Sequence, residues 1–152
     1  MTSITAMLKH EADLVTRFRD TLLCEQEILR SGKTDGLAEI NADKLSLAES
    51  LNVANAERSR NLLSIDGTYV DMQDWFSNHP MERESASLWK KLLELAREAR
   101  EINEANGSLI NSLHQKTSDA LTILTLGQGE LSIYSCNGQA SLSTSSRIVD
   151  SA

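Results

Sequence analysis

Apolar side chains recur along residues 82–125 at alternating steps of four and three positions, the spacing of one continuous helical seam. The seam has two polar interruptions, Asn106 and Lys116, and its positions are Leu88, Leu92, Leu95, Ala99, Ile102, Asn106, Leu109, Leu113, Lys116, Ala120 and Ile123. The pattern predicts one long helix of about 60 Å, at about 1.5 Å per residue. A helix of that length needs partner helices, because an apolar seam is stable only when it is covered.

Two earlier segments, residues 4–30 and 37–64, carry the same rhythm and are separated by a Gly-rich turn. A connection this short predicts that the two helices are antiparallel neighbours. We therefore expect an all-α fold, an elongated antiparallel bundle of three main helices, one of them long and coiled-coil-like. We place the helical domain at residues 1–126 and a flexible C-terminal tail at residues 127–152.

Two positive charges, Lys44 and Arg58, interrupt the seam of the second helix. For Lys44 we expect the stem to cover apolar surface while the ammonium group reaches water or a facing acid such as Glu25. We interpret Arg58 in the same way.

Large aromatic side chains gather between the second and the long helix, at Tyr69, Trp75 and Phe76, with Trp89 a short distance beyond. Pro80 follows them, and proline suits the first turn of a helix. The segment predicts a short helix or compact loop that plugs one end of the bundle. A surface patch that binds a partner is the alternative.

Polar and small residues, Asn103, Asn106 and Gly107, interrupt the middle of the long helix. A glycine there costs about 1 kcal/mol relative to alanine, so the motif needs a reason. We expect a helix crossing, in which Gly107 allows close approach and a buried Asn sets the register. Direct contact with a ligand is the alternative.

The last segment, residues 127–152, differs from the rest because it holds three Gly, seven Ser and only three charged residues. Its apolar residues include Leu131, Ile133, Leu142 and Ile148. This composition suits a segment that becomes ordered when it binds a partner. A floppy terminus is the alternative.

Charge and motif content exclude several classes of protein. With 15 Lys and Arg against 22 Asp and Glu, the net charge of −7 argues against nucleic acid or an anionic membrane as partner. Cys24 and Cys136 lie in unlike segments, and no leader or membrane span is evident, so we expect a cytoplasmic protein without a disulfide. No metal, phosphate or nucleophile motif is present, so we expect no cofactor and no enzymatic activity.

Three stretches of the chain resemble the FlgN family of flagellar export chaperones. Residues 22–51 are similar to the family's leucine-and-acid hairpin with its Lys, here Lys44. Asn103-x-x-Asn106-Gly107 resembles the family's mid-helix Asn-Gly signature.

The third stretch, residues 131–139, is similar to the family's Tyr-Gly-Pro-Asp-Gly-Gln turn. Tyr134, Gly138 and Gln139 match, whereas Ser135-Cys136-Asn137 replaces Gly-Pro-Asp. Asn-Gly keeps the turn chemistry without proline.

The resemblance implies a chaperone that binds the hook-filament junction proteins FlgK and FlgL, prevents their premature association and delivers them to the flagellar type III export apparatus. It implies that the tail binds the client, through Leu131, Ile133, Leu142 and Ile148 here, and that Tyr134 docks on the export gate FlhA. Contact with the export ATPase is also implied, without assigned residues. The alternative is a structural homo-oligomeric coiled-coil protein that has no export client.

Overall fold

The computed structural model describes residues 3–62, 67–68 and 70–128, and in these residues it contains four α-helices and no strand. The helices are α1 (Ile4–Ser31), α2 (Leu37–Asn61), α3 (Met72–Asn78) and α4 (Arg83–Gln128). The prediction of an all-α fold is confirmed. The chain divides into two units, residues 1–106 and 107–152, and α4 begins in the first and ends in the second. The predicted domain boundary after residue 126 stays a prediction.

The ends of α1 follow from local sequence signals. Ser3 precedes the helix, and its Oγ accepts a hydrogen bond of 3.2 Å from the backbone N–H of Ala6. Gly32 ends α1 at φ 72°, and Gly36 precedes α2 at φ 89°. Both backbones are left-handed, a conformation that glycine adopts without strain. The chain therefore reverses direction within a few residues.

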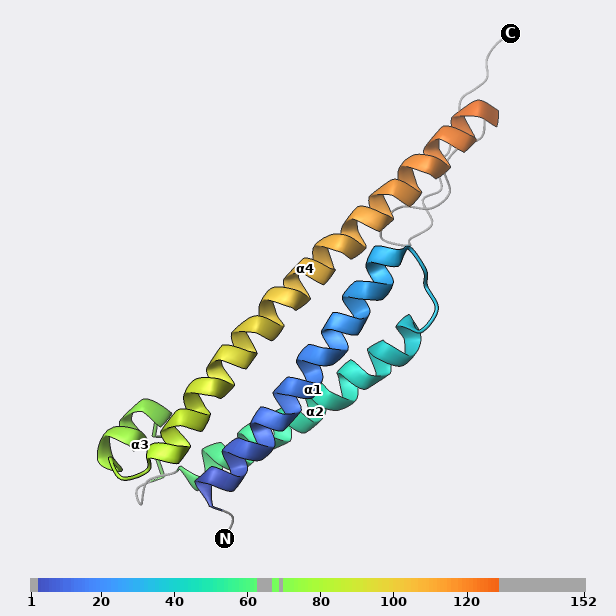
Figure 1. Cartoon of the computed structure of the whole chain (residues 1–152). Coiled ribbons are helices and arrows are strands. Elements are labelled where there is room, and N and C mark those ends of the chain that lie inside the picture. Colours follow the sequence, from blue (N-terminus) through green and yellow to red (C-terminus); the bar gives the residue numbers. More distant parts are fainter. Residues whose placement is uncertain (1–2, 63–66, 69, 129–152) are drawn as a thin grey trace. The chain divides into compact units, whose positions relative to one another are not determined.

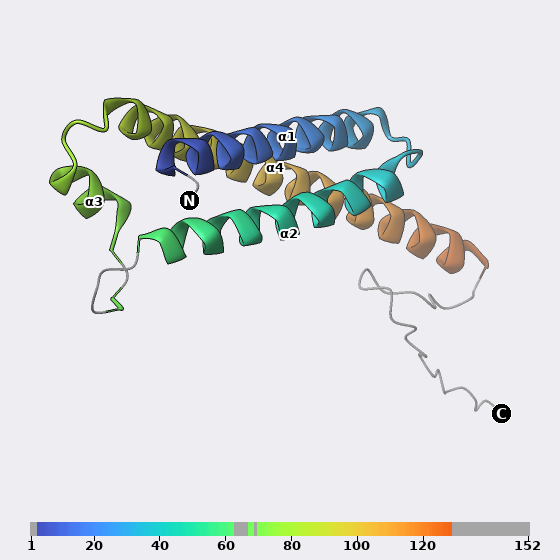
Figure 2. The same cartoon turned by 90° about the horizontal axis from the view of Figure 1, so that it is seen from below.

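Two ion pairs set the register between α1 and α2. Arg58 Nε lies 2.7 Å from Glu11 Oε2, and Lys44 Nζ lies 3.1 Å from Glu25 Oε1. The two acids are two heptads apart on α1, and the two bases are two heptads apart on α2 in the opposite order. The two helices therefore run antiparallel, as Figure 2 shows.

Within the first unit, α4 runs beside α1 in the same direction (Figure 1). The Oγ1 of Thr5 and the Oγ of Ser85 share a hydrogen bond of 2.8 Å near the start of both helices. Towards the end of α1, Asn106 Nδ2 donates to the backbone carbonyl of Leu22 at 2.9 Å. These bonds join α1 to the first part of α4, as the ion pairs join it to α2.

An exposed contact between α1 and α4 lies at Arg19. Its Nη1 donates to Glu98 Oε2 at 3.2 Å, and its Nε and Nη2 donate to Asp20 Oδ1. Hydrogen bonds to Asp20 and to Glu98 raise the pKa of the Arg19 guanidinium, which therefore stays charged.

The aromatic segment packs over one end of the helices of the first unit. Leu8, Leu62 and Met72 form a buried cluster there, with exposed fractions of 0%, 5% and 2%. The partly buried side chains around this cluster are Ile4, Trp75, Phe76, Leu88 and Trp89. The predicted plug is confirmed for these residues, whereas Tyr69 lies outside the described residues.

Arg58 is the centre of a buried polar cluster that sequence alone did not reveal in full. Its Nε and Nη2 donate to the two carboxylate oxygens of Glu11 at 2.7 and 3.2 Å, and Nη2 also donates to Asn55 Oδ1 at 2.7 Å. The guanidinium carbon lies 4.8 Å from the centre of the Trp89 ring, which adds a cation–π contact with α4. The predicted pairing is present, but the charge is buried rather than solvated.

We expect Glu11→Ala to lower the free energy of unfolding by about 3 kcal/mol, since breaking a buried ion pair costs about 3–5 kcal/mol. The variant leaves the Arg58 charge buried without its carboxylate. Urea denaturation followed by far-UV circular dichroism measures the change.

The matched control is Lys9→Ala, which breaks the 2.9 Å pair between Lys9 and Glu84 on the surface. The two side chains are 58% and 68% exposed, so we expect a change below about 1 kcal/mol. Equal losses in the two variants would show that burial adds nothing to the Glu11–Arg58 pair.

Candidate functional site

The polar motif in the middle of α4 contains one buried side chain, Asn106, which is 1% exposed. Its Nδ2 donates two hydrogen bonds of 2.9 Å, one to the Leu22 carbonyl and one to Glu25 Oε2. Both acceptors belong to α1, so the asparagine joins α4 to α1 at one register.

Glu25 connects three helices through one carboxylate. It is 2% exposed, and its two oxygens accept hydrogen bonds from Lys44 Nζ of α2 at 3.1 and 3.2 Å. The same carboxylate accepts the bond from Asn106 of α4. The predicted contact between Lys44 and Glu25 is confirmed.

One atom of this cluster has no partner among the described residues, the Oδ1 of Asn106. Both amide hydrogens already point to acceptors, so the amide orientation is dictated by Leu22 and Glu25. A buried acceptor without a hydrogen bond costs about 1–3 kcal/mol. The asparagine therefore links the helices at a local cost in stability.

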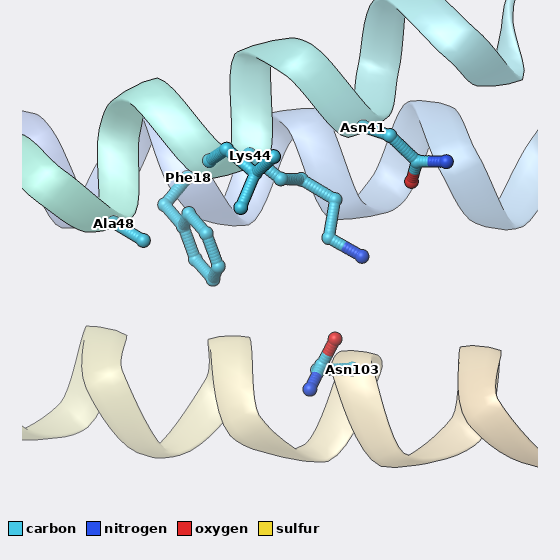
Figure 3. Close-up of a pocket in the computed structure, with 6 residues that line it drawn as sticks. Phe18, Asn41, Lys44, Ala48 and Asn103 are labelled. Carbon is cyan, nitrogen blue, oxygen red and sulfur yellow. The ribbon is translucent and has the colours of Figure 1, made fainter.

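Asn103, one turn before Asn106, lines an open hollow of about 430 Å³ (Figure 3). The side chains that line it with Asn103 are Phe18, Asn41, Lys44, Leu45 and Ala48. Figure 3 shows the residues of α2 on one side of the hollow and Asn103 of α4 on the opposite side. Asn41, Leu45 and Asn103 are exposed, so solvent and larger partners can reach the hollow.

Sequence analysis identified Asn103 but not the α2 wall of this hollow. Asn41, Leu45 and Ala48 follow one another at steps of four and three, beside the seam that faces α1. This second, uncharged stripe was the sequence signal that could have identified the α2 wall of the hollow. The rotation of α2 against α4, on which the hollow depends, could not be read from spacing.

The third residue of the motif, Gly107, has no steric need to be glycine among the described residues. A Cβ placed on it would have no atom within 4 Å, its own helix backbone aside. The open space does not explain the glycine, and its predicted role in a helix crossing stays a prediction.

In the second unit, described by itself, α4 exposes a series of apolar side chains. Ile123, Leu124 and Leu126 are 71%, 61% and 72% exposed. Ile110, Leu113 and Leu121 are exposed to a lesser degree. Between residues 107 and 126, only Lys116 and Asp119 carry a formal charge at neutral pH. An exposed surface this apolar is typical of a site that contacts another molecule.

The predicted tail sites lie outside the described residues. They are Leu131, Ile133, Leu142 and Ile148 for the client and Tyr134 for the export gate.

Among the residues with described positions, no group of three or more His, Cys, Asp or Glu could hold a metal ion. Cys24 is exposed and carries no disulfide. None of the helices in the described part of the chain has the length and apolarity to cross a membrane.

One comparison with known proteins gives a match. A family model described as FlgN protein matches residues 1–141. No curated protein and no solved structure matches the chain. The matched range contains all four helices and the three stretches on which the sequence resemblance rests.

We expect Asn106→Asp to lower the free energy of unfolding at pH 7 by about 2–4 kcal/mol, because a carboxylate oxygen would replace the N–H group that faces Leu22 and Glu25. Burial and the like charge raise the pKa of the new carboxyl group in the folded state above its unfolded value. The lost stability therefore returns as the pH falls towards about 4.

Urea denaturation of the variant and the parent protein at pH 7 and pH 5 measures this difference. Asn103→Asp, the same substitution at an exposed position one turn away, is the control and should have little effect at either pH. An Asn106→Asp loss that does not shrink at pH 5 would contradict the proposed charge contact.

Proposed function

The chain belongs to the FlgN family of flagellar export chaperones, and on this basis we propose that it is a cytoplasmic chaperone for hook-filament junction proteins of the FlgK and FlgL type. It binds them through its C-terminal region and prevents their premature association. It then delivers them to the flagellar type III export apparatus.

The observation that carries the proposal is the exposed apolar surface of α4 beyond Asn106. Six large apolar side chains there are at least partly open to solvent, and formal charges are few. Each 100 Å² of apolar surface that a client buries contributes about 2.5 kcal/mol before ordering costs. A client with an amphipathic segment can therefore cover part of this surface and bury its own apolar side in the same step.

The tail contributes the remaining contacts in this proposal. Leu131, Ile133, Leu142 and Ile148 bind the client, at an ordering cost of about 2–5 kcal/mol if they fold upon binding. Tyr134 contacts the export gate FlhA, since a lone aromatic in a polar segment can anchor an interface. Contact with the export ATPase is part of the proposal without assigned residues.

Such a chaperone works by covering surface, so its proposed action needs no catalytic group and no cofactor. Nucleic acid and membrane insertion have no part in it.

We expect the double variant Ile123→Glu and Leu126→Glu to bind a purified FlgK-type junction protein at least about tenfold more weakly, because each charge would have to be desolvated in the interface. Both positions are exposed, so the far-UV circular dichroism spectrum should not change. Titration calorimetry with the full chain measures the affinity.

The control carries the same two charges at exposed polar positions of the first unit, away from the proposed site, Ser46→Glu and Ser87→Glu. A third arm, Leu131→Glu with Ile133→Glu, tests the tail in the same titration. A junction protein that does not bind the parent chain would refute the proposed function. Binding that is indifferent to both apolar double variants would refute the C-terminal site.

We expect Tyr134→Ala to leave client binding nearly unchanged and to weaken the contact with the export gate about tenfold, because one aromatic anchor is lost from that interface alone. Titration of the chaperone–client complex with the cytoplasmic part of FlhA measures the second effect. Equal losses for client and gate would contradict this division of roles.

A further inference from the structure

The hollow of the first unit lies between two helices and has a third behind it. Asn41, Lys44, Leu45 and Ala48 line it from α2, Asn103 lines it from α4, and Phe18 of α1 contributes an aromatic side chain (Figure 3). Two helices joined through a third leave a groove of the kind that a further helix fills in a four-helix packing.

The α2 side of this groove is exposed because α2 buries little. Ala54 and Arg58 are the buried residues of this helix of 25 residues. Leu45 is 68% exposed, and it lies on the same face of α2 as Asn41 and Ala48. The face continues with Asn52 at the next step of four, so it stays uncharged for more than three turns.

The groove also lacks free charge. Lys44 is the one charged residue among the six that line it, and its ammonium group is already paired with Glu25. Charged residues make up 24% of the chain, so an exposed lining of amides and apolar groups departs from the rest of the surface. The partner surface that suits this groove is therefore uncharged, because a charged group placed there would be desolvated without gaining an ion-pair partner.

We propose that this groove is a second client site, which binds the uncharged face of an amphipathic α-helix of the client. The apolar side chains of that helix fill the hollow beside Phe18, Leu45 and Ala48. The amides of Asn41 and Asn103 pair with Ser, Thr, Asn or Gln side chains at its edges. The identity of the helix as a client segment rests on the proposed function.

Charge favours this occupant over a second copy of the chain. Each copy carries a net charge of −7, so two copies repel each other before their uncharged faces meet. Self-association is therefore an outcome that the experiment has to detect, and so is coverage of the groove by the chain's own tail.

The test uses Leu45→Glu in the full chain and titration calorimetry with a purified FlgK-type junction protein. Leu45 is exposed, so the substitution leaves the helical content unchanged. We expect the affinity to fall about tenfold. Ser46→Glu, an exposed neighbour on another face of α2, places the same charge outside the groove and should change the affinity less than about twofold.

Amide hydrogen exchange and light scattering identify the occupant. We expect residues 41–52 to gain protection from amide exchange when the junction protein is added. We also expect Leu45→Glu and the parent chain to have the same molecular mass in light scattering. Unchanged affinity of Leu45→Glu overturns the groove site and leaves the proposed function intact. Failure of the parent chain to bind the client refutes both.

A dimer that Leu45→Glu dissociates assigns the groove to a second copy and overturns the client site. Residues 41–52 could also be protected in the free chain, and the double variant Leu131→Glu with Ile133→Glu could remove that protection. This result would assign the groove to the tail and would also overturn the client site.

Discussion

Two buried carboxylates on α1 hold the first unit together. Glu11 binds Arg58 of α2, whose guanidinium lies on the Trp89 ring of α4. Glu25 binds Lys44 of α2 and Asn106 of α4. Each carboxylate thus links α1 to both neighbours. A shift of one helix by a single residue would leave a buried charge unpaired, so the two clusters exclude other registers at a cost in desolvation.

This way of joining helices explains why α2 is so exposed. A helix held by a broad apolar stripe buries many side chains, whereas α2 buries Ala54 and Arg58 and depends on its two cations. Few apolar contacts are then needed to keep it in place. The outer face stays open, and the side chains of Asn41, Leu45 and Ala48 become available to line a groove beside α4. The ion pairs on one face of α2 and the exposed side chains on its other face are therefore two results of the same arrangement.

Periodicity predicted the helices well because it depends on local spacing. The predicted range 4–30 became Ile4–Ser31, and 37–64 became Leu37–Asn61. The Lys44–Glu25 contact was also predictable, because both residues lie on facing seams of antiparallel neighbours.

The stacking of Arg58 on Trp89 and the hollow at Asn103 were not predictable from spacing. Both depend on how α4 is rotated against α2, and side-chain spacing within one helix carries no information on that rotation. The open space at Gly107 is a further case, since a glycine in a sequence does not say which backbone, if any, comes close. The tail roles rest on resemblance, because residues 129–152 lie outside the part of the chain that the structure describes.

The position of the two tryptophans has a practical consequence. Trp75 and Trp89, the only indoles of the chain, both pack against the cluster of Leu8, Leu62 and Met72. Intrinsic fluorescence therefore reports on the aromatic end of the first unit. The emission of Trp89 is a direct optical reporter of the Arg58 cluster, whereas the sequence of the second unit contains no tryptophan, so a fluorescence signal that originates in that unit requires an introduced label.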